Sequence, residues 1–209
     1  MKRYKLLLLV CACSIGMQAQ DMKTLFTQMP DILLPQLETA WRKDLADLYL
    51  NGKEARLQNI MEGYSRLLEL TADYLLLQVT ERSYVEMKTL PLINNTHILC
   101  VVTTVEGPAP DSRIAFYTTD WQPLEASGLF NPVKAEDFLV AANADNDAYL
   151  DAAALLDMDL IRYRLSPGDL TLTASLSTPA YLQRTNSARV EPFLRNQPIV
   201  FTWNKSSFR

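Results

Sequence analysis

Two helices are predicted before residue 70 from the spacing of apolar side chains. The apolar positions of the first recur every three or four residues, as in an amphipathic helix, and are Leu37, Trp41, Leu45 and Leu48. Charged residues stand between them, Arg42 included, and Asn51-Gly52 supplies residue types that end a helix. The second predicted helix carries Ile60, Tyr64, Leu67 and Leu68 on one side.

From Asp73 onward the apolar period becomes two, which is typical of β-strands. Strands are predicted over residues 74–79, 84–90, 97–105 and 114–118. The links between them are short and rich in turn residues, as in Gly107-Pro108-Ala109-Pro110-Asp111. Such short links favour four antiparallel strands in meander order.

The second half of the chain shows the same kinds of element. A helix is predicted over 145–156, and strands over 160–165, 170–177 and 199–204. Shifted back by 86 positions, these features fall on those of the first half. The fold class is therefore α+β, with N-terminal helices followed by antiparallel sheet. Two packed units of one helix and four strands, over 24–120 and 121–209, and one irregular α+β domain both remain open.

The N-terminal 20 residues have the three parts of a secretory signal peptide. Lys2, Arg3 and Lys5 precede an apolar stretch over 6–17, and Ala19 supplies a small residue at a cleavage point. We expect residues 1–20 to be removed and 21–209 to form a single mature domain in the periplasm or outer envelope. An alternative is lipid anchoring at Cys13, although cleavage there would leave an unusually short signal.

The charge of the mature chain narrows the choice of partners. Removal of the signal takes away three basic residues and no acidic ones, which leaves 17 basic against 24 acidic residues and shifts the net charge from -4 to -7. An acidic chain disfavours nucleic acid and anionic membrane surfaces as partners. After residue 20, no segment is long and apolar enough to predict a transmembrane span.

Residues that bind metals or act as nucleophiles are scarce. His97 is the only histidine, and Cys100 is the only cysteine beyond the signal, so a zinc site with three or four ligands is not predicted. In a strand, residues three apart point to opposite faces, which separates His97 from Cys100. We expect Cys100 to be buried in a strand, and we predict neither a catalytic residue nor a cofactor.

Acidic residues offer the remaining chemistry. Asn143, Asp145 and Asp147 resemble the start of a calcium loop, but alanine stands where such a loop needs glycine and glutamate. Residues 145–147 are therefore expected to cap the following helix. Asp157 and Asp159 would share one face of a strand, which keeps a carboxylate-based hydrolase as an alternative.

The candidate partner-binding residues are Tyr117, Asp120 and Trp121. Aromatic side chains at the end of a strand can stack on a sugar or anchor a partner protein. The competing interpretation is structural. In it, the two aromatic rings cover the end of the sheet, and Asp120 accepts backbone hydrogen bonds in the turn.

Three blocks of sequence resemble those of a known family. They are Met29 to Pro35, Asp73 to Gln78 followed by Glu86-Met87-Lys88, and Phe116 to Pro123. In these blocks the chain is similar to the domain of unknown function 3256 family of exported Bacteroidetes proteins, from about residue 24 to 138. The resemblance implies a Gram-negative envelope or periplasmic setting and assigns no activity.

Two functions from different classes follow. The first is a non-enzymatic binding or interaction module of the cell envelope, whose partner would be an envelope protein or a glycan. The alternative is a hydrolase of glycans or peptides that uses two carboxylates, at least one with a raised pKa.

Overall fold

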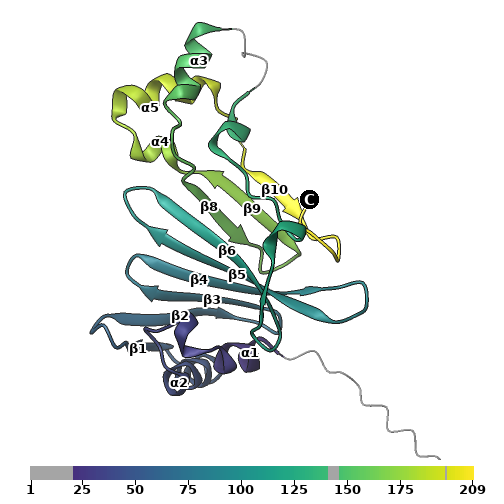
Figure 1. Ribbon diagram of the computed structural model, residues 1–209. Coiled ribbons are helices and arrows are strands. Elements are labelled where there is room, and N and C mark those ends of the chain that lie inside the picture. The colour runs from purple at the N-terminus through teal and green to yellow at the C-terminus, as the bar shows by residue number, and fades with distance from the viewer. Residues whose placement is uncertain (1–20, 141–145, 196) are drawn as a thin grey trace, which may run out of the picture.

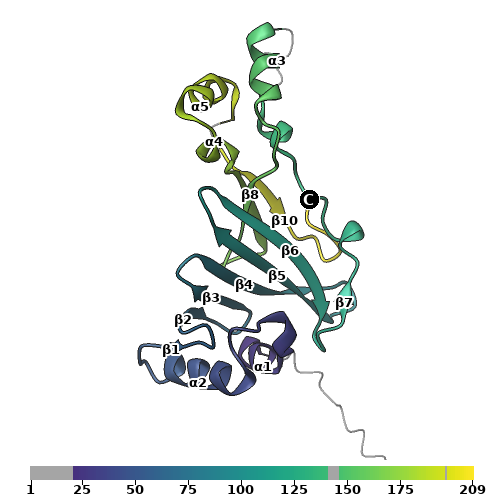
Figure 2. The same ribbon diagram turned by 60° about the vertical axis from the view of Figure 1, so that its left-hand side comes forward.

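The computed structural model describes residues 21–140, 146–195 and 197–209, which form two antiparallel sheets. Strands β1 to β7 form a seven-stranded sheet in chain order, and the small sheet has the order β10-β9-β8. The N-terminal helices cover one face of the large sheet, and the small sheet lies on the opposite side (Figure 1 and Figure 2). The predicted α+β class, with N-terminal helices followed by antiparallel sheet, is confirmed.

The large sheet is a simple meander. Its strands are β1 (Arg56–Gln58), β2 (Tyr64–Leu70), β3 (Tyr74–Thr80), β4 (Ser83–Pro91), β5 (His97–Glu106), β6 (Pro110–Thr118) and β7 (Pro123–Leu124). The four predicted strands are β3 to β6, and only β6 begins clearly earlier than expected. Short turns join each strand to the next, so consecutive strands pair antiparallel.

The second predicted helix does not form, because its residues belong to β1 and β2. The pairing of β2 with β3 shifts between Leu67 and Glu69, which indicates a β-bulge. The extra residue places apolar side chains at 64, 67 and 68, and this spacing imitates that of a helix. Ile60 and Tyr64 are exposed, while Ser65 and Leu67 are buried.

The two faces of the large sheet bury different kinds of side chain. Leu75, Met87 and Leu99 belong to the apolar core on the helix side. On the other face the register aligns Lys88 with Cys100, and both are buried against the small sheet. The prediction that Cys100 is buried in a strand is therefore confirmed. Burial raises the pKa of its thiol.

The helix side is organised around a buried arginine. Helix α1 (Met22–Gln28), the 3-10 turn η1 (Asp31–Leu33) and α2 (Thr39–Leu50) pack on the sheet. The Arg42 side chain is 0% exposed, donates to the backbone carbonyls of Phe26, Met29 and Leu37, and pairs with Asp31. The spacing of apolar residues did not predict that Arg42, one of the charged residues between them, is buried; these carbonyls replace water around its guanidinium.

The two N-terminal helices differ in how well the sequence predicted them. The sequence pattern did not predict α1, which contributes Met22, Leu25 and Phe26 to the core. The predicted end of α2 is confirmed, since Asn51 is the C-cap residue and Gly52 has a φ of +66°. Glycine adopts this left-handed conformation without the steric cost of a Cβ atom.

The small sheet consists of β8 (Ile161–Leu165), β9 (Thr171–Leu176) and β10 (Ile199–Thr202). Its edge strand β8 lies across β4, β5 and β6. The backbone N–H groups of Ile161, Tyr163 and Leu165 donate to side chains of the large sheet, namely Asp111, Ser112 and Glu86. The free edge of β8 is thus hydrogen-bonded to side chains of the other sheet rather than to water.

Short helices complete the C-terminal part. They are η2 (Ala126–Gly128), η3 (Ala135–Phe138), α3 (Asp147–Ala154), α4 (Thr178–Tyr181), α5 (Arg184–Val190) and η5 (Glu191–Phe193). The helix predicted over 145–156 corresponds to α3, and Asn146 caps it by accepting from the N–H of Ala148. Asn143 and Asp145 of the rejected calcium loop lie outside the described residues.

One prediction for the second half needs correction. Asp157 and Asp159 lie before β8 rather than on a strand, and Asp159 accepts a hydrogen bond from the N–H of Ala135. The division into one domain or two repeats stays a prediction.

Candidate functional site

The structure places two of the predicted partner-binding residues against the N-terminal helices. Trp121 is only 6% exposed and belongs to the helix-side core, with Tyr117 packed beside it. Their ring centroids lie 5.5 Å apart. The indole N–H donates to the backbone carbonyl of Leu25 at 3.1 Å, and this bond ties the turn after β6 to α1.

The turn that contains Asp120 is held by a different residue. The Thr118 hydroxyl accepts from the N–H of Gln122, and the Thr118 carbonyl accepts from the N–H of Trp121. Asp120 is exposed. The two aromatic rings therefore cover the end of the sheet, as the structural interpretation expected. A role of Tyr117, Asp120 and Trp121 in binding a partner stays a prediction. Such a role would require the buried indole to leave its contacts.

An apolar pocket lies at the end of the large sheet where β6 ends and β5 begins, on the side that faces the small sheet. It has a volume of about 610 Å³, within the usual range for small-ligand sites. Its apolar lining includes Leu92, Ile98, Leu124 and Leu129, and its polar residues include His97 and Glu125. Sequence patterns did not predict this pocket. Its lining comes from residues 92–98 and 118–129, and only the pairing of the strands brings these two separate segments together.

The pocket forms because β4 and β5 extend beyond their neighbours. The last pair between β3 and β4 is Tyr74 with Lys88, whereas the pairing of β4 with β5 continues to Pro91 and His97. The hairpin after β4 is closed by the N–H of Leu92, which donates to the carbonyl of Thr96 at 2.8 Å. Segment 123–129 then passes from the large sheet toward the small one and forms the opposite wall.

The edges of this pocket leave room for a ligand. Ile93, at the tip of the hairpin, is 77% exposed, which places an apolar side chain in solvent beside Leu92. Gly128 lines the pocket, and a Cβ atom built on it would have no atom within 4 Å, so a larger side chain fits at this position. The arrangement suits an apolar group with a small polar end near His97 and Glu125, because apolar walls with few polar groups favour such ligands.

A buried polar cluster joins the two sheets, and its centre is Glu86 on β4. Its carboxylate accepts from the N–H of Leu165 at 2.9 Å and from the Tyr74 hydroxyl at 3.3 Å. Burial raises the pKa of Glu86, and the Leu165 hydrogen bond and the charge of Arg164 oppose this shift. Burial beside Glu86 also raises the pKa of the Tyr74 hydroxyl.

Lys88 completes this cluster without opening it to solvent. Its ammonium group pairs with Asp73 at 2.9 Å and donates to the backbone carbonyl of Pro167 at 3.0 Å. The polar groups of Glu86 and Lys88 are thus bonded to other parts of the protein. The cluster therefore acts as a connection between β4 and the turn after β8.

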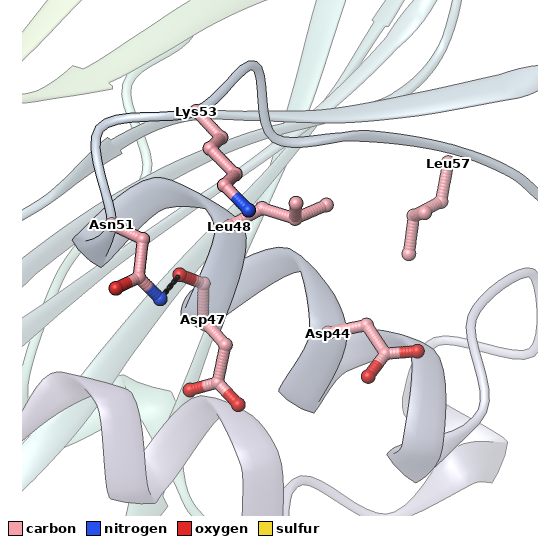
Figure 3. Close-up of a pocket in the computed structure, with 6 residues that line it drawn as sticks. All are labelled: Asp44, Asp47, Leu48, Asn51, Lys53 and Leu57. Atoms are coloured by element: carbon pink, nitrogen blue, oxygen red, sulfur yellow. Dashed lines mark hydrogen bonds between the residues drawn. The ribbon is translucent and has the colours of Figure 1, made fainter.

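Two acidic residues line a smaller pocket of about 340 Å³ between α2 and β1 (Figure 3). Asp44 and Asp47 come from the same helix, and Leu48, Lys53 and Leu57 line the space beside them. Both acids are exposed, and Asp47 pairs with Lys23 at 2.9 Å. Acid catalysis needs a carboxyl group in an apolar environment, and these solvated acids lack one.

Clustered metal ligands and long apolar helices are both missing from the part of the chain that the structure describes. Among the described residues, no three His, Cys, Asp or Glu side chains gather into a metal-binding group. Within residues 21–140, 146–195 and 197–209, no helix is long and apolar enough to cross a membrane.

Comparisons with known proteins give one family and one similar structure. A family model described as "Protein of unknown function (DUF3256)" matches residues 14–208. A solved structure, described as a domain of an uncharacterized protein from Porphyromonas gingivalis W83, has a TM-score of 0.80 and 28% sequence identity. The likeness covers 91% of this chain and 99% of that one. No curated protein matches.

Proposed function

The chain belongs to the DUF3256 family, and we propose that it is a non-enzymatic, exported binding protein of the cell envelope. Its ligand is an apolar group, either a small molecule or part of a partner, that enters the pocket between the β4–β5 hairpin and segment 123–129. The observation that carries this proposal is the pocket of about 610 Å³ with its predominantly apolar wall. Removing such surface from water favours binding by about 25 cal/mol per Å².

The positions of the acidic residues favour binding over hydrolysis. Glu86 has a raised pKa, but protein groups occupy its carboxylate. Asp44 and Asp47 share a pocket but are exposed on one helix. A hydrolase with two carboxylates needs both properties in one cleft.

The test places a bulky side chain at Gly128, one of the residues that line the pocket. Gly128→Phe places a ring in the space beside η2, where even a Cβ atom meets nothing within 4 Å. Gly168→Phe, in the turn between β8 and β9, is the matched control, because its Cβ also meets nothing within 4 Å. The probe is the neutral fluorophore N-phenylnaphthylamine, which brightens in apolar surroundings.

The two variants should behave differently. We expect Gly128→Phe to weaken binding of the fluorophore by about fivefold or more, which corresponds to ~1 kcal/mol, and Gly168→Phe to bind like the wild type. Equal affinity for all three proteins would contradict the pocket as the binding site. Turnover of peptidoglycan fragments or casein peptides by the wild-type protein would contradict the non-enzymatic part of the proposal.

A further inference from the structure

The small-sheet side of the large sheet is left open over its first strands. β8 crosses β4, β5 and β6, so β1 and β2 extend beyond it (Figure 1). On β2, Ser65 and Leu67 are buried, whereas Tyr64 and Arg66 are exposed. Tyr64 and Arg66 are two residues apart in the strand and therefore lie on the same face.

A line of polar side chains crosses this open face at right angles to the strands. The strand register pairs Arg56 with Arg66, Arg66 with Gln78, and Gln78 with Tyr84. Directly paired residues project to the same side, and adjacent strands lie about 4.8 Å apart. The same row continues through Thr104 to the Ser112 hydroxyl, which accepts from the β8 backbone, so the line lies on the small-sheet side.

The side chains on this line present hydrogen-bond donors and an aromatic ring. The Arg56 guanidinium lies 3.5 Å from the centroid of the Tyr64 ring, which holds both side chains in place. The Gln78 amide donates to the Tyr84 hydroxyl at 3.4 Å. Each arginine carries five N–H donors and no acceptor, so the line suits a ligand rich in acceptor oxygens.

Among the described residues, Arg56, Arg66 and Arg164 take part in no ion pair. The ion pairs there involve Lys23, Arg42, Lys88, Lys134, Arg162 and Arg189. Arg56 and Arg66 stand directly opposite each other, an arrangement that costs stability when both charges are the same. Arg164 is also exposed and precedes Leu165, whose N–H binds Glu86 on β4.

Acidic residues border the line without pairing with its arginines. Glu62 and Glu81 are exposed in the turns after β1 and β3, and Glu54 is exposed before β1. Glu69 projects to the same face one row away, because its register partner is Leu76 rather than Gln78. A basic face on a chain with a net charge of -4 is a local feature that complements an anionic ligand. It does not follow from the composition.

We propose that this face, the line of Arg56, Tyr64, Arg66, Gln78 and Tyr84 together with Arg164, binds an acidic oligosaccharide. Guanidinium groups bind carboxylate or sulfate oxygens in a bidentate manner, and the Tyr64 ring offers an apolar surface to a sugar ring. A peptide is disfavoured because an extended peptide would add along a sheet edge such as β1 and run parallel to the strands, whereas the line of side chains runs across them.

The test uses immobilised polygalacturonate and dextran sulfate, which carry carboxylate and sulfate groups, with neutral dextran and poly-glutamate for comparison. We expect retention of the wild type on at least one acidic polysaccharide, lost as salt is raised, and weaker retention on neutral dextran and poly-glutamate. Arg66→Gln should weaken this binding about five- to tenfold, since bidentate charged contacts are the strong ones.

The matched control is Arg113→Gln. Arg113 is exposed on β6, and its register partner Thr103 places it on the opposite face of the same sheet. Both substitutions remove one positive charge, so equal losses would overturn the proposal by showing that net charge alone governs retention. Failure to bind either acidic polysaccharide, or equal retention on poly-glutamate, would also overturn it. Neither result bears on the proposed apolar pocket, because its test residue Gly128 lies in that pocket and not on the line of arginines.

Discussion

Replacing Glu86 by alanine would remove the carboxylate that connects the large sheet to β8. Glu86 is 6% exposed and accepts from the Leu165 N–H and the Tyr74 hydroxyl. In the Glu86→Ala variant both donors would remain buried without this acceptor. The substitution therefore tests whether the two sheets are joined through this side chain.

The size of the effect follows from the groups left without a partner. A buried donor that loses its acceptor costs ~1–3 kcal/mol, and the loss of the charge that burial disfavours offsets part of this cost. We expect Glu86→Ala to lower the free energy of unfolding by about 2–4 kcal/mol at pH 7. Glu86→Gln keeps a carbonyl oxygen for the Leu165 N–H and should lie within ~1 kcal/mol of wild type.

The pH dependence of the Gln variant supplies a second measurement. Burial raises the pKa of Glu86 in the folded state above its unfolded value. Between these two values the folded protein binds more protons than the unfolded chain, so wild-type stability falls as pH rises through this window. Glutamine does not titrate. The stability of wild type relative to Glu86→Gln should therefore be highest below the ordinary carboxyl pKa and decline toward neutral pH.

The assay is urea unfolding followed by tryptophan fluorescence at several pH values. Trp203 reports on the small-sheet side, where its indole N–H donates to the carbonyl of Pro91 at 2.7 Å, and Trp121 reports on the helix side. Glu81→Gln, an exposed turn residue, is the control and should change stability by less than about 0.5 kcal/mol. The reasoning is refuted if Glu86→Gln loses as much as Glu86→Ala, or if its difference from wild type does not change with pH.

Two further predictions concern the N-terminal part of the chain. Arg42→Met should lower the free energy of unfolding by about 3–5 kcal/mol, because the carbonyls of Met29 and Leu37 lose their side-chain donor in the core. Urea unfolding measures this loss. A loss no larger than that of Lys43→Met, its exposed neighbour, would contradict it. Expression in a Gram-negative host should yield an exported protein that begins at Gln20 or Asp21. N-terminal sequencing and intact mass measure where the chain begins. A lipidated chain that begins at Cys13 would contradict the prediction.

Local patterns were sufficient where each element depends on its own residues. The alternation of Leu75, Leu77 and Val79 predicted β3, and the short turns predicted the meander order of β3 to β6. The same local pattern failed over 60–68, because the bulge at Leu67 and Glu69 adds one residue and disturbs the period of two. The three sequence blocks also indicated the family, which the match over residues 14–208 shows.

The sequence by itself determined the α+β class, the order of the central strands and the burial of Cys100, because a period of two and a turn are properties of neighbouring residues. Only the tertiary structure decided that Arg42 is buried, since its acceptors come from backbone carbonyls of three separate residues. It also decided that Glu86 accepts from a strand 79 residues away. Contacts over such distances depend on how the sheets pack, and hydrophobic periodicity carries no record of that packing.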